Sequence, residues 1–234
     1  MISASLTAYP HFSPATFTFL EELAANNNRD WFSDHKRRYE QDVRIPALAL
    51  IDAVGKRLPG FAPHFVADSR KTGGSLMRIY RDTRFSKQKT PYKTNIGIQF
   101  RHEAGKDIHA PGYYIHISAV ECFIGVGIWH PPTDALAAIR KAMVEKPELW
   151  LETCHDEQFK RWFSLSGSSL KTAPRGFDRA HPLIDDLRRK DFIGIGHLAP
   201  ALVEQQDFSD IACDYFAVGT PFMRFLCSAL RLPF

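Results

Sequence analysis

The order of apolar and polar side chains predicts helices at the start of the chain. Ser13 followed by Pro14 is a typical helix start, and apolar side chains then recur at helical spacing up to a run of three asparagines. Asp30 is expected to cap a second helix, which Pro46 should kink or restart because proline removes a backbone donor. The pattern ends at Pro59, so residues 14–58 are predicted to be mainly helical.

The hydrophobic period changes to two in the middle of the chain, as expected for half-buried strands. The predicted strands cover residues 76–81, 95–102, 112–119 and 121–129. Gly125 and Gly127 in the last of these indicate a bulge or a close approach of another group to the backbone. Consecutive strands of this kind favour neighbouring positions in an antiparallel sheet.

The second half returns to helical spacing around one further strand. Helices are expected after Pro131 and Pro147, a short one over residues 181–190, and a closing pair over 208–230 that breaks near Gly219, with a strand at 192–195. Strands set between helical segments, without a regular β-α-β alternation, favour an α+β fold. We expect a mainly antiparallel sheet packed with helices, in a single domain over residues 1–234.

Composition narrows the class of protein. The 234 residues are 44% hydrophobic, enough for one filled core. The longest apolar runs fall far short of a membrane span, and the N-terminus lacks a secretory signal, so we expect a cytoplasmic protein without a membrane partner. Neither the four cysteines nor the histidines have metal-ligand spacing, so no metal site and no cofactor is expected. Nothing in the pattern predicts the oligomeric state.

Charge is concentrated in one stretch, which we name the basic segment, from Ser69 to Arg101. It contains nine lysines and arginines and a single acid, Asp82. Its local net charge is +8, whereas the whole chain carries +4, so the remainder is net negative. The predicted ligand contacts are Arg78, Arg81, Arg84, Lys87, Lys89, Tyr92 and Lys93. Such a cluster is typical of sites for a phosphate-bearing small molecule or nucleic acid.

Two alternatives to simple anion binding stay open. In one, the protein is an enzyme acting on a small phosphorylated or carboxylated substrate, with His116, Tyr114 and Glu121 as candidate acid–base residues beside the arginines. In the other, the arginines pair with internal carboxylates and the protein is a scaffold domain. No Walker-type loop and no Gly-x-Ser-x-Gly elbow is present, so neither motif supports an enzyme class.

Several motifs together resemble a family of conserved hypothetical proteins, a domain of unknown function found in many bacteria and in fungi. They are residues 26–32, the Arg-Asp-Thr-Arg-Phe-Ser-Lys-x-Lys-x-Pro-Tyr-Lys-Thr run from Arg81 to Thr94, and residues 112–116, 125–129 and 174–177. His35 departs from the resemblance, because similar sequences often have Asn there. The resemblance implies one complete α+β domain and brings with it no activity, substrate or cofactor.

Overall fold

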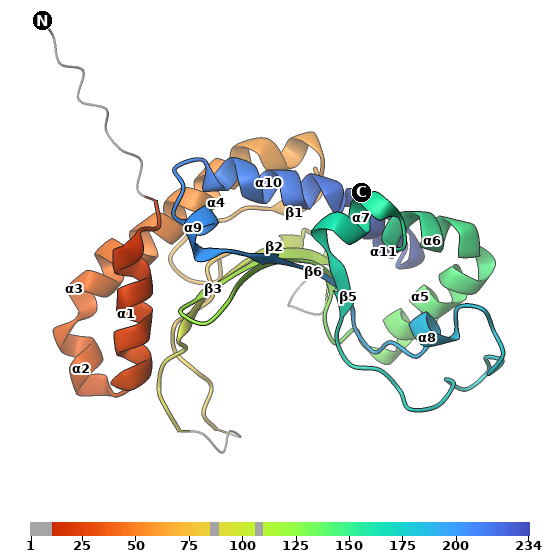
Figure 1. The fold of residues 1–234 in the computed structure, drawn as a ribbon, viewed down its shortest axis with the longest axis horizontal. Helices are drawn as coiled ribbons and strands as arrows, with labels where there is room; N and C mark the ends of the chain where they lie inside the picture. Colours follow the sequence, from red (N-terminus) through yellow and green to blue (C-terminus); the bar gives the residue numbers. More distant parts are fainter. Residues whose placement is uncertain (1–10, 85–88, 106–109) are drawn as a thin grey trace, which may run out of the picture.

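The computed structural model describes residues 11–84, 89–105 and 110–234. In this part of the chain six strands form one antiparallel sheet in the order β1-β2-β3-β4-β6-β5 (Figure 1). The strands are β1 Phe65–Val66, β2 Asn95–His102, β3 Gly112–Ser118, β4 Cys122–Ile128, β5 Ser164–Ser166 and β6 Phe192–Leu198. The predicted α+β class with a mainly antiparallel sheet is confirmed.

Helices precede and follow the central strands, as the hydrophobic period predicts. They are α1 Pro14–Ala25, α2 Arg29–Asp34, α3 Lys36–Arg38, the π-helix η1 Tyr39–Arg44, α4 Ile45–Arg57, the 3-10 turn η2 Leu58–Gly60, α5 Thr133–Glu145, α6 Pro147–Cys154, α7 Glu157–Trp162, α8 Ile184–Leu187, α9 Pro200–Val203, α10 Phe208–Val218 and α11 Thr220–Ala229. No helix among the described residues is both long and apolar enough to cross a bilayer.

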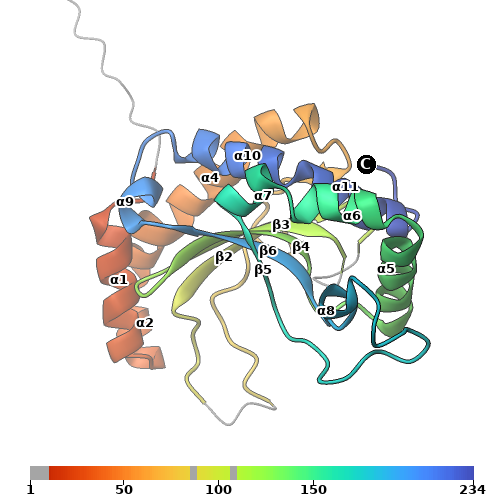
Figure 2. The same cartoon turned by 45° about the vertical axis from the view of Figure 1, so that its right-hand side comes forward.

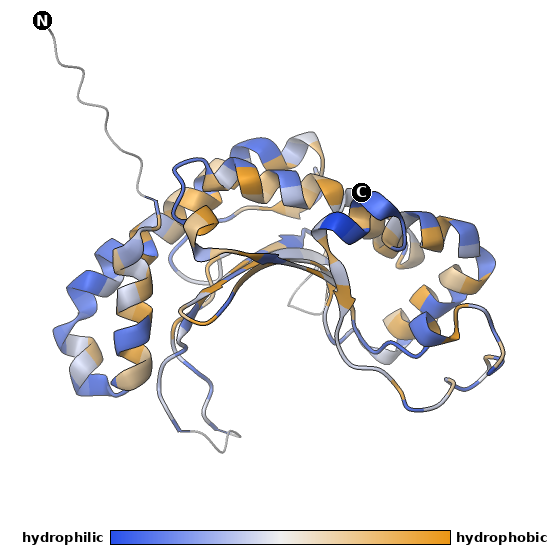
Figure 3. Cartoon of the chain, in the orientation of Figure 1, coloured by the Kyte–Doolittle hydropathy of each residue, from blue (hydrophilic) through white to orange (hydrophobic). Residues whose placement is uncertain are grey.

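One face of the sheet is covered and the other is open. Helices α4, α10 and α11 lie across the covered face, where Ile98, Ile115 and Ile124 form a fully buried row (Figure 1). The sheet curves away from these helices. Residues 78–84 and 89–94 and the chain between β5 and β6 descend on the two sides of its other face (Figure 2). Orange, apolar ribbon is concentrated along the sheet and the helices that cover it (Figure 3).

The helical run around Pro46 continues through a π-helix. Proline cannot donate to the carbonyl of Asp42, four residues earlier, so that oxygen lacks its usual α-helical donor. The hydroxyl of Thr16, which is fully buried in α1, donates to it at 2.6 Å. Helix α4 then begins at Ile45. The expected kink or restart at Pro46 is therefore a change of helix type, stabilised from α1.

A second buried polar contact joins α6 to α8. The carboxylate of Asp186 accepts hydrogen bonds from Trp150 Nε1 and Arg189 Nε, both at 2.8 Å, and His155 Nε2 lies 2.6 Å away. Burial acts to raise the pKa of Asp186, but the three partners outweigh it, and the pKa lies below its usual value. Asp186 therefore stays ionised inside the protein.

Some predicted elements differ from the structure. The predicted strand at residues 76–81 is wrong, because this stretch is extended but forms only the isolated bridges of Leu76 and Tyr80. Helix α2 is capped by Asn28, whose side chain accepts from Trp31 N, and Asp30 lies in the first turn. Only residues 184–187 of the predicted 181–190 helix are helical. Strands β1 and β5 were not predicted, since strands of two or three residues leave no period to detect.

Candidate functional site

The open face of the sheet presents side chains in rows set by strand register. Gln99, Tyr114, Gly125 and Ile195 are aligned across β2, β3, β4 and β6. The next row contains Gly97, His116, Phe123 and His197. Because side chains alternate between faces along a strand, the polar and aromatic residues of these rows all lie opposite the helix-covered core. The predicted outward positions of β2 are confirmed.

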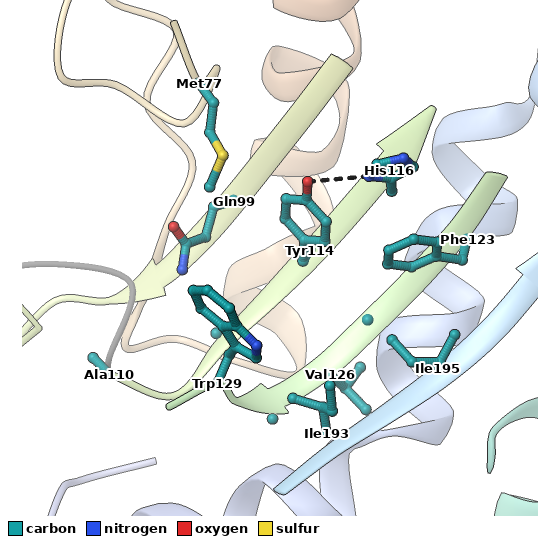
Figure 4. A pocket seen from close by; sticks show the side chains of 13 residues that line it. Met77, Gln99, Ala110, Tyr114, His116, Phe123, Val126, Trp129, Ile193 and Ile195 are labelled. Atoms are coloured by element: carbon teal, nitrogen blue, oxygen red, sulfur yellow. Dashed lines mark hydrogen bonds between the residues drawn. The ribbon is translucent and has the colours of Figure 1, made fainter. Parts of the chain in front are cut away.

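A concave pocket of about 420 Å³ lies on this face, and we name it the sheet pocket. Aromatic and aliphatic side chains and the Met77 sulfur line it, with the Gln99 amide between Met77 and Trp129 (Figure 4). The Tyr114 ring stands in the middle, and Ile195 closes the side formed by β6. The volume is in the range of small-molecule sites.

Glycines keep the sheet pocket open. A Cβ atom at Gly125 would meet Tyr114 Cβ at 3.5 Å and Ile195 Cδ1 at 3.7 Å, which are ordinary contacts. Gly125 is therefore not required by crowding, and its missing side chain leaves space above the sheet. Gly97 differs, because a Cβ there would lie 2.8 Å from the Tyr114 hydroxyl. Gly127 has φ +131 and its Cβ would lie 2.0 Å from the Phe192 oxygen, so the close approach predicted for this strand is confirmed.

The predicted acid–base residues gather at the end of the sheet pocket nearest the start of β2. His116 Nδ1 lies 3.3 Å from the Tyr114 hydroxyl and 3.5 Å from Asn95 Nδ2. Its Nε2 lies 3.9 Å from Glu121 Oε1, and its ring stacks on Phe123 with centroids 4.6 Å apart. Both neighbours of Nδ1 can donate to it, which favours the tautomer with the proton on Nε2.

Burial shifts the pKa values of two of these groups in opposite directions. Burial lowers the pKa of His116, while the charge of Glu121 opposes the shift. Burial also raises the pKa of Tyr114 to about 12, with a hydrogen bond from Asn95 opposing it. At neutral pH the imidazole is therefore a neutral acceptor and the phenol a donor. The chemistry available here is proton acceptance at an imidazole nitrogen.

Two stretches of the basic segment pair with each other beside the start of β2. We name them the first arm, residues 78–84, and the second arm, residues 89–93. Arg81 N donates to Pro91 O at 2.9 Å, and Lys93 N donates to Ile79 O at 2.7 Å. This pairing brings together a second, open pocket, which we name the anion pocket. It is lined by Arg81, Asp82, Lys93, Thr94 and Asn95. Two of the predicted ligand contacts thus line one cavity.

Lys93 is the least compensated cation of this pocket. Burial, and after it the charge of Arg78, lowers the pKa of its ammonium group. Within the described residues no carboxylate lies at ion-pair distance from the side chain of Lys93 or Arg78. The carboxylate of Asp82 is occupied by Arg84, at 2.7 Å, which helps to hold the pKa of Asp82 at about 2. An anion beside Lys93 would relieve an unfavourable arrangement of charge.

The other predicted ligand contacts lie elsewhere. Arg84 is exposed and bound to Asp82, and Lys89 Nζ donates to the Thr83 carbonyl at 2.9 Å. Tyr92 is only 4% exposed and stacks on Phe32, with centroids 4.1 Å apart, so its ring contributes to the core. Lys87 lies outside the described residues. Lys89 and Tyr92 do line a third, open pocket with Arg81, which is bounded on its other side by residues 27–30. Arg81 faces this pocket too, because its guanidinium group donates to the Thr90 hydroxyl at 2.8 Å.

Two asparagines that sequence reasoning did not single out organise the site. The Asn27 amide accepts from Tyr92 N and donates to Tyr92 O, both at 3.0 Å, as a neighbouring strand would. This clamp holds the arm that ends at Lys93. Asn95 lines the anion pocket and also lies against His116, so it connects the cations with the acid–base group. The available signals were that Asn95 lies within the basic segment and Asn27 within the motif of residues 26–32.

A histidine–aspartate pair supports the opposite end of the sheet pocket. His130 Nδ1 lies 2.6 Å from Asp191 Oδ1, and Asp191 Oδ2 accepts from Ser168 N and Oγ, both at 2.8 Å. His130 has φ +48, an unusual backbone conformation, and its ring stacks on Trp129 at 4.0 Å. This pair therefore fixes the orientation of a pocket wall. Sequence spacing gave no sign of it.

Comparison with known proteins gives a family and no assigned activity. No curated protein matches the chain, and no solved structure does. The model of a conserved hypothetical protein family, DUF2461, matches residues 15–225, which include every strand, both pockets and both asparagines. Because the match covers most of the 234 residues, the chain belongs to the DUF2461 family of conserved hypothetical proteins.

Proposed function

We propose that this protein binds a small anionic ligand, with a phosphate or carboxylate group held in the anion pocket by Arg81 and Lys93. The observation that supports this most is the Lys93 ammonium group, which is partly desolvated beside Arg78 and has no carboxylate partner among the described residues. A cation kept in this state costs folding free energy. Binding of an anion would recover that cost.

A small molecule fits this arrangement better than a nucleic-acid strand. The cations that line the cavity are local, and Arg84 is already paired with Asp82. A strand would require a groove of cations that follows several successive phosphates. The anion pocket instead supplies one compact group of donors, joined through Asn95 to the sheet pocket.

Titration with inorganic phosphate at low ionic strength tests the proposal. We expect saturable binding with one site per chain, weakened by added sodium chloride because charge dominates the contact. Arg81→Ala should weaken binding, whereas Arg175→Ala, a change of the same type on an exposed loop far along the sequence, should leave it within twofold. Absence of saturable phosphate binding in the wild type would refute the proposal and favour a scaffold role.

A second candidate function is an enzyme in which His116 accepts a proton from the bound ligand. The specific observation in its favour is the contact of Asn95 with both the anion pocket and His116 Nδ1. A neutral imidazole with a lowered pKa is a competent general base near neutral pH. His116→Asn should abolish turnover of a phosphorylated substrate while leaving the phosphate affinity unchanged. Equal turnover in the two proteins would exclude His116 as the base.

A further inference from the structure

The sheet pocket and the anion pocket lie near the same strand, β2. Gln99 lines the first and Asn95 lines the second, and both belong to β2. The two residues are four steps apart along the strand, or roughly 13 Å. Asn95, Tyr114 and His116 bridge the interval on the same face. A ligand that occupies both pockets must therefore be long, with its anionic group at one end.

The sheet pocket is suited to a flat ring. Phe123, Tyr114 and Trp129 offer aromatic surfaces, and Met77 adds a polarisable sulfur. The missing side chain of Gly125 lets a planar group approach the backbone of β4. Stacking on an aromatic side chain strengthens the binding of a nucleobase by about 5- to 150-fold.

The side chain of Gln99 is placed to form hydrogen bonds with the edge of such a ring. Gln99 is half-buried, and its side-chain amide makes no hydrogen bond to any described residue. A glutamine amide pairs in two places with the adenine edge that carries a donor beside an acceptor. The pocket thus combines stacking surfaces with an amide that could pair with a base edge.

We propose that the ligand is a purine nucleotide, with its base in the sheet pocket and its phosphate in the anion pocket. This inference rests on the proposed function for the phosphate end. The base end rests on separate observations, namely the aromatic lining, the space above Gly125 and the Gln99 amide, which has no hydrogen-bond partner in the described part of the chain.

Calorimetric titrations with AMP, ribose 5-phosphate and inorganic phosphate separate the two ends. We expect AMP to bind at least tenfold more tightly than either of the other two. Gly125→Val should raise the Kd of AMP at least tenfold and change that of phosphate less than twofold. Lys93→Met should weaken all three. Gly60→Val is the matched control, because a Cβ at Gly60 meets nothing within 4 Å.

Two results would refute the nucleotide assignment but leave the proposed anion binding intact. They are equal affinities for AMP and ribose 5-phosphate, or AMP binding that Gly125→Val does not affect. AMP binding that responds to Gly125→Val but not to Lys93→Met would instead refute the assignment of phosphate to the anion pocket. If Gly125→Val unfolds, Gly125→Ala is used, since its methyl group makes only ordinary contacts. A several-fold loss of AMP affinity in that variant supports the inference, and no loss overturns it.

Discussion

Replacing Lys93 with methionine should change the stability of the protein and its phosphate affinity in opposite directions. Methionine keeps an unbranched apolar stem and removes a charge that burial and Arg78 disfavour. In the ligand-free protein the variant should therefore be at least as stable as the wild type. A gain of about 1 kcal/mol would raise Tm by about 2–4 °C for a chain of this size.

The same change should weaken phosphate binding. A hydrogen bond to a charged group contributes about 1.5–3 kcal/mol, so the loss of the Lys93 contact should cost about 2 kcal/mol. That corresponds to about a 30-fold increase in Kd. Lys71→Met, at an exposed turn of the same basic segment, makes the same change in net charge and serves as the control.

The assay pairs thermal unfolding without ligand with calorimetric titration of phosphate at low salt. The pH dependence adds a sign test. The pKa of Lys93 lies below 10.5 in the folded protein and at the ordinary value of 10.5 in the unfolded chain. At a pH between these two pKa values the unfolded chain binds more protons, so wild-type stability should rise with pH. Lys93→Met should lack this rise. A variant that loses stability yet binds phosphate normally would show that Lys93 serves the fold and not a ligand.

Three further predictions concern the surroundings of the site. Asn27→Ala removes both hydrogen bonds to Tyr92 and should cost about 1–3 kcal/mol in urea unfolding. Phosphate affinity should fall with it, and an unchanged affinity would show that the clamp does not position the arm. Asp186→Asn should cost about 3 kcal/mol at neutral pH. Because the pKa of Asp186 is lowered in the folded protein, its contribution to stability is present above pH 3.8 and is lost as the pH falls below that value. The difference in stability between the variant and the wild type should therefore disappear in acid. The folded pKa of His116 is also lowered, so its contribution is present above 6.5 and lost as pH falls; His116→Asn should reduce the fall in Tm between pH 7.5 and 5.5, and an unchanged fall would contradict this origin.

The fold was largely predictable because its elements have strong periods. In β2 the alternation of Ile96, Ile98 and Phe100 with polar residues identifies the buried face, and the structure agrees. Elements without a local period were missed. The π-helix depends on a hydroxyl from α1, where Thr16 contacts Asp42, and no sequence window contains that contact.

The site was predictable only in part, because charge density does not reveal which cations face a common cavity. Arg81 and Lys93 line the anion pocket, whereas Arg84 has an acid two residues away that satisfies it. The sheet pocket depends on register across four strands, which placed Gly125 between Tyr114 and Ile195. Sequence reasoning could place each residue on a strand face but not align the rows.

The most direct test of the central claim is an NMR titration of the Lys93 side chain, with and without inorganic phosphate. We predict a pKa of Lys93 below 10.5 in the free protein and a higher value in the presence of saturating phosphate. A pKa of Lys93 that phosphate leaves unchanged would contradict the account.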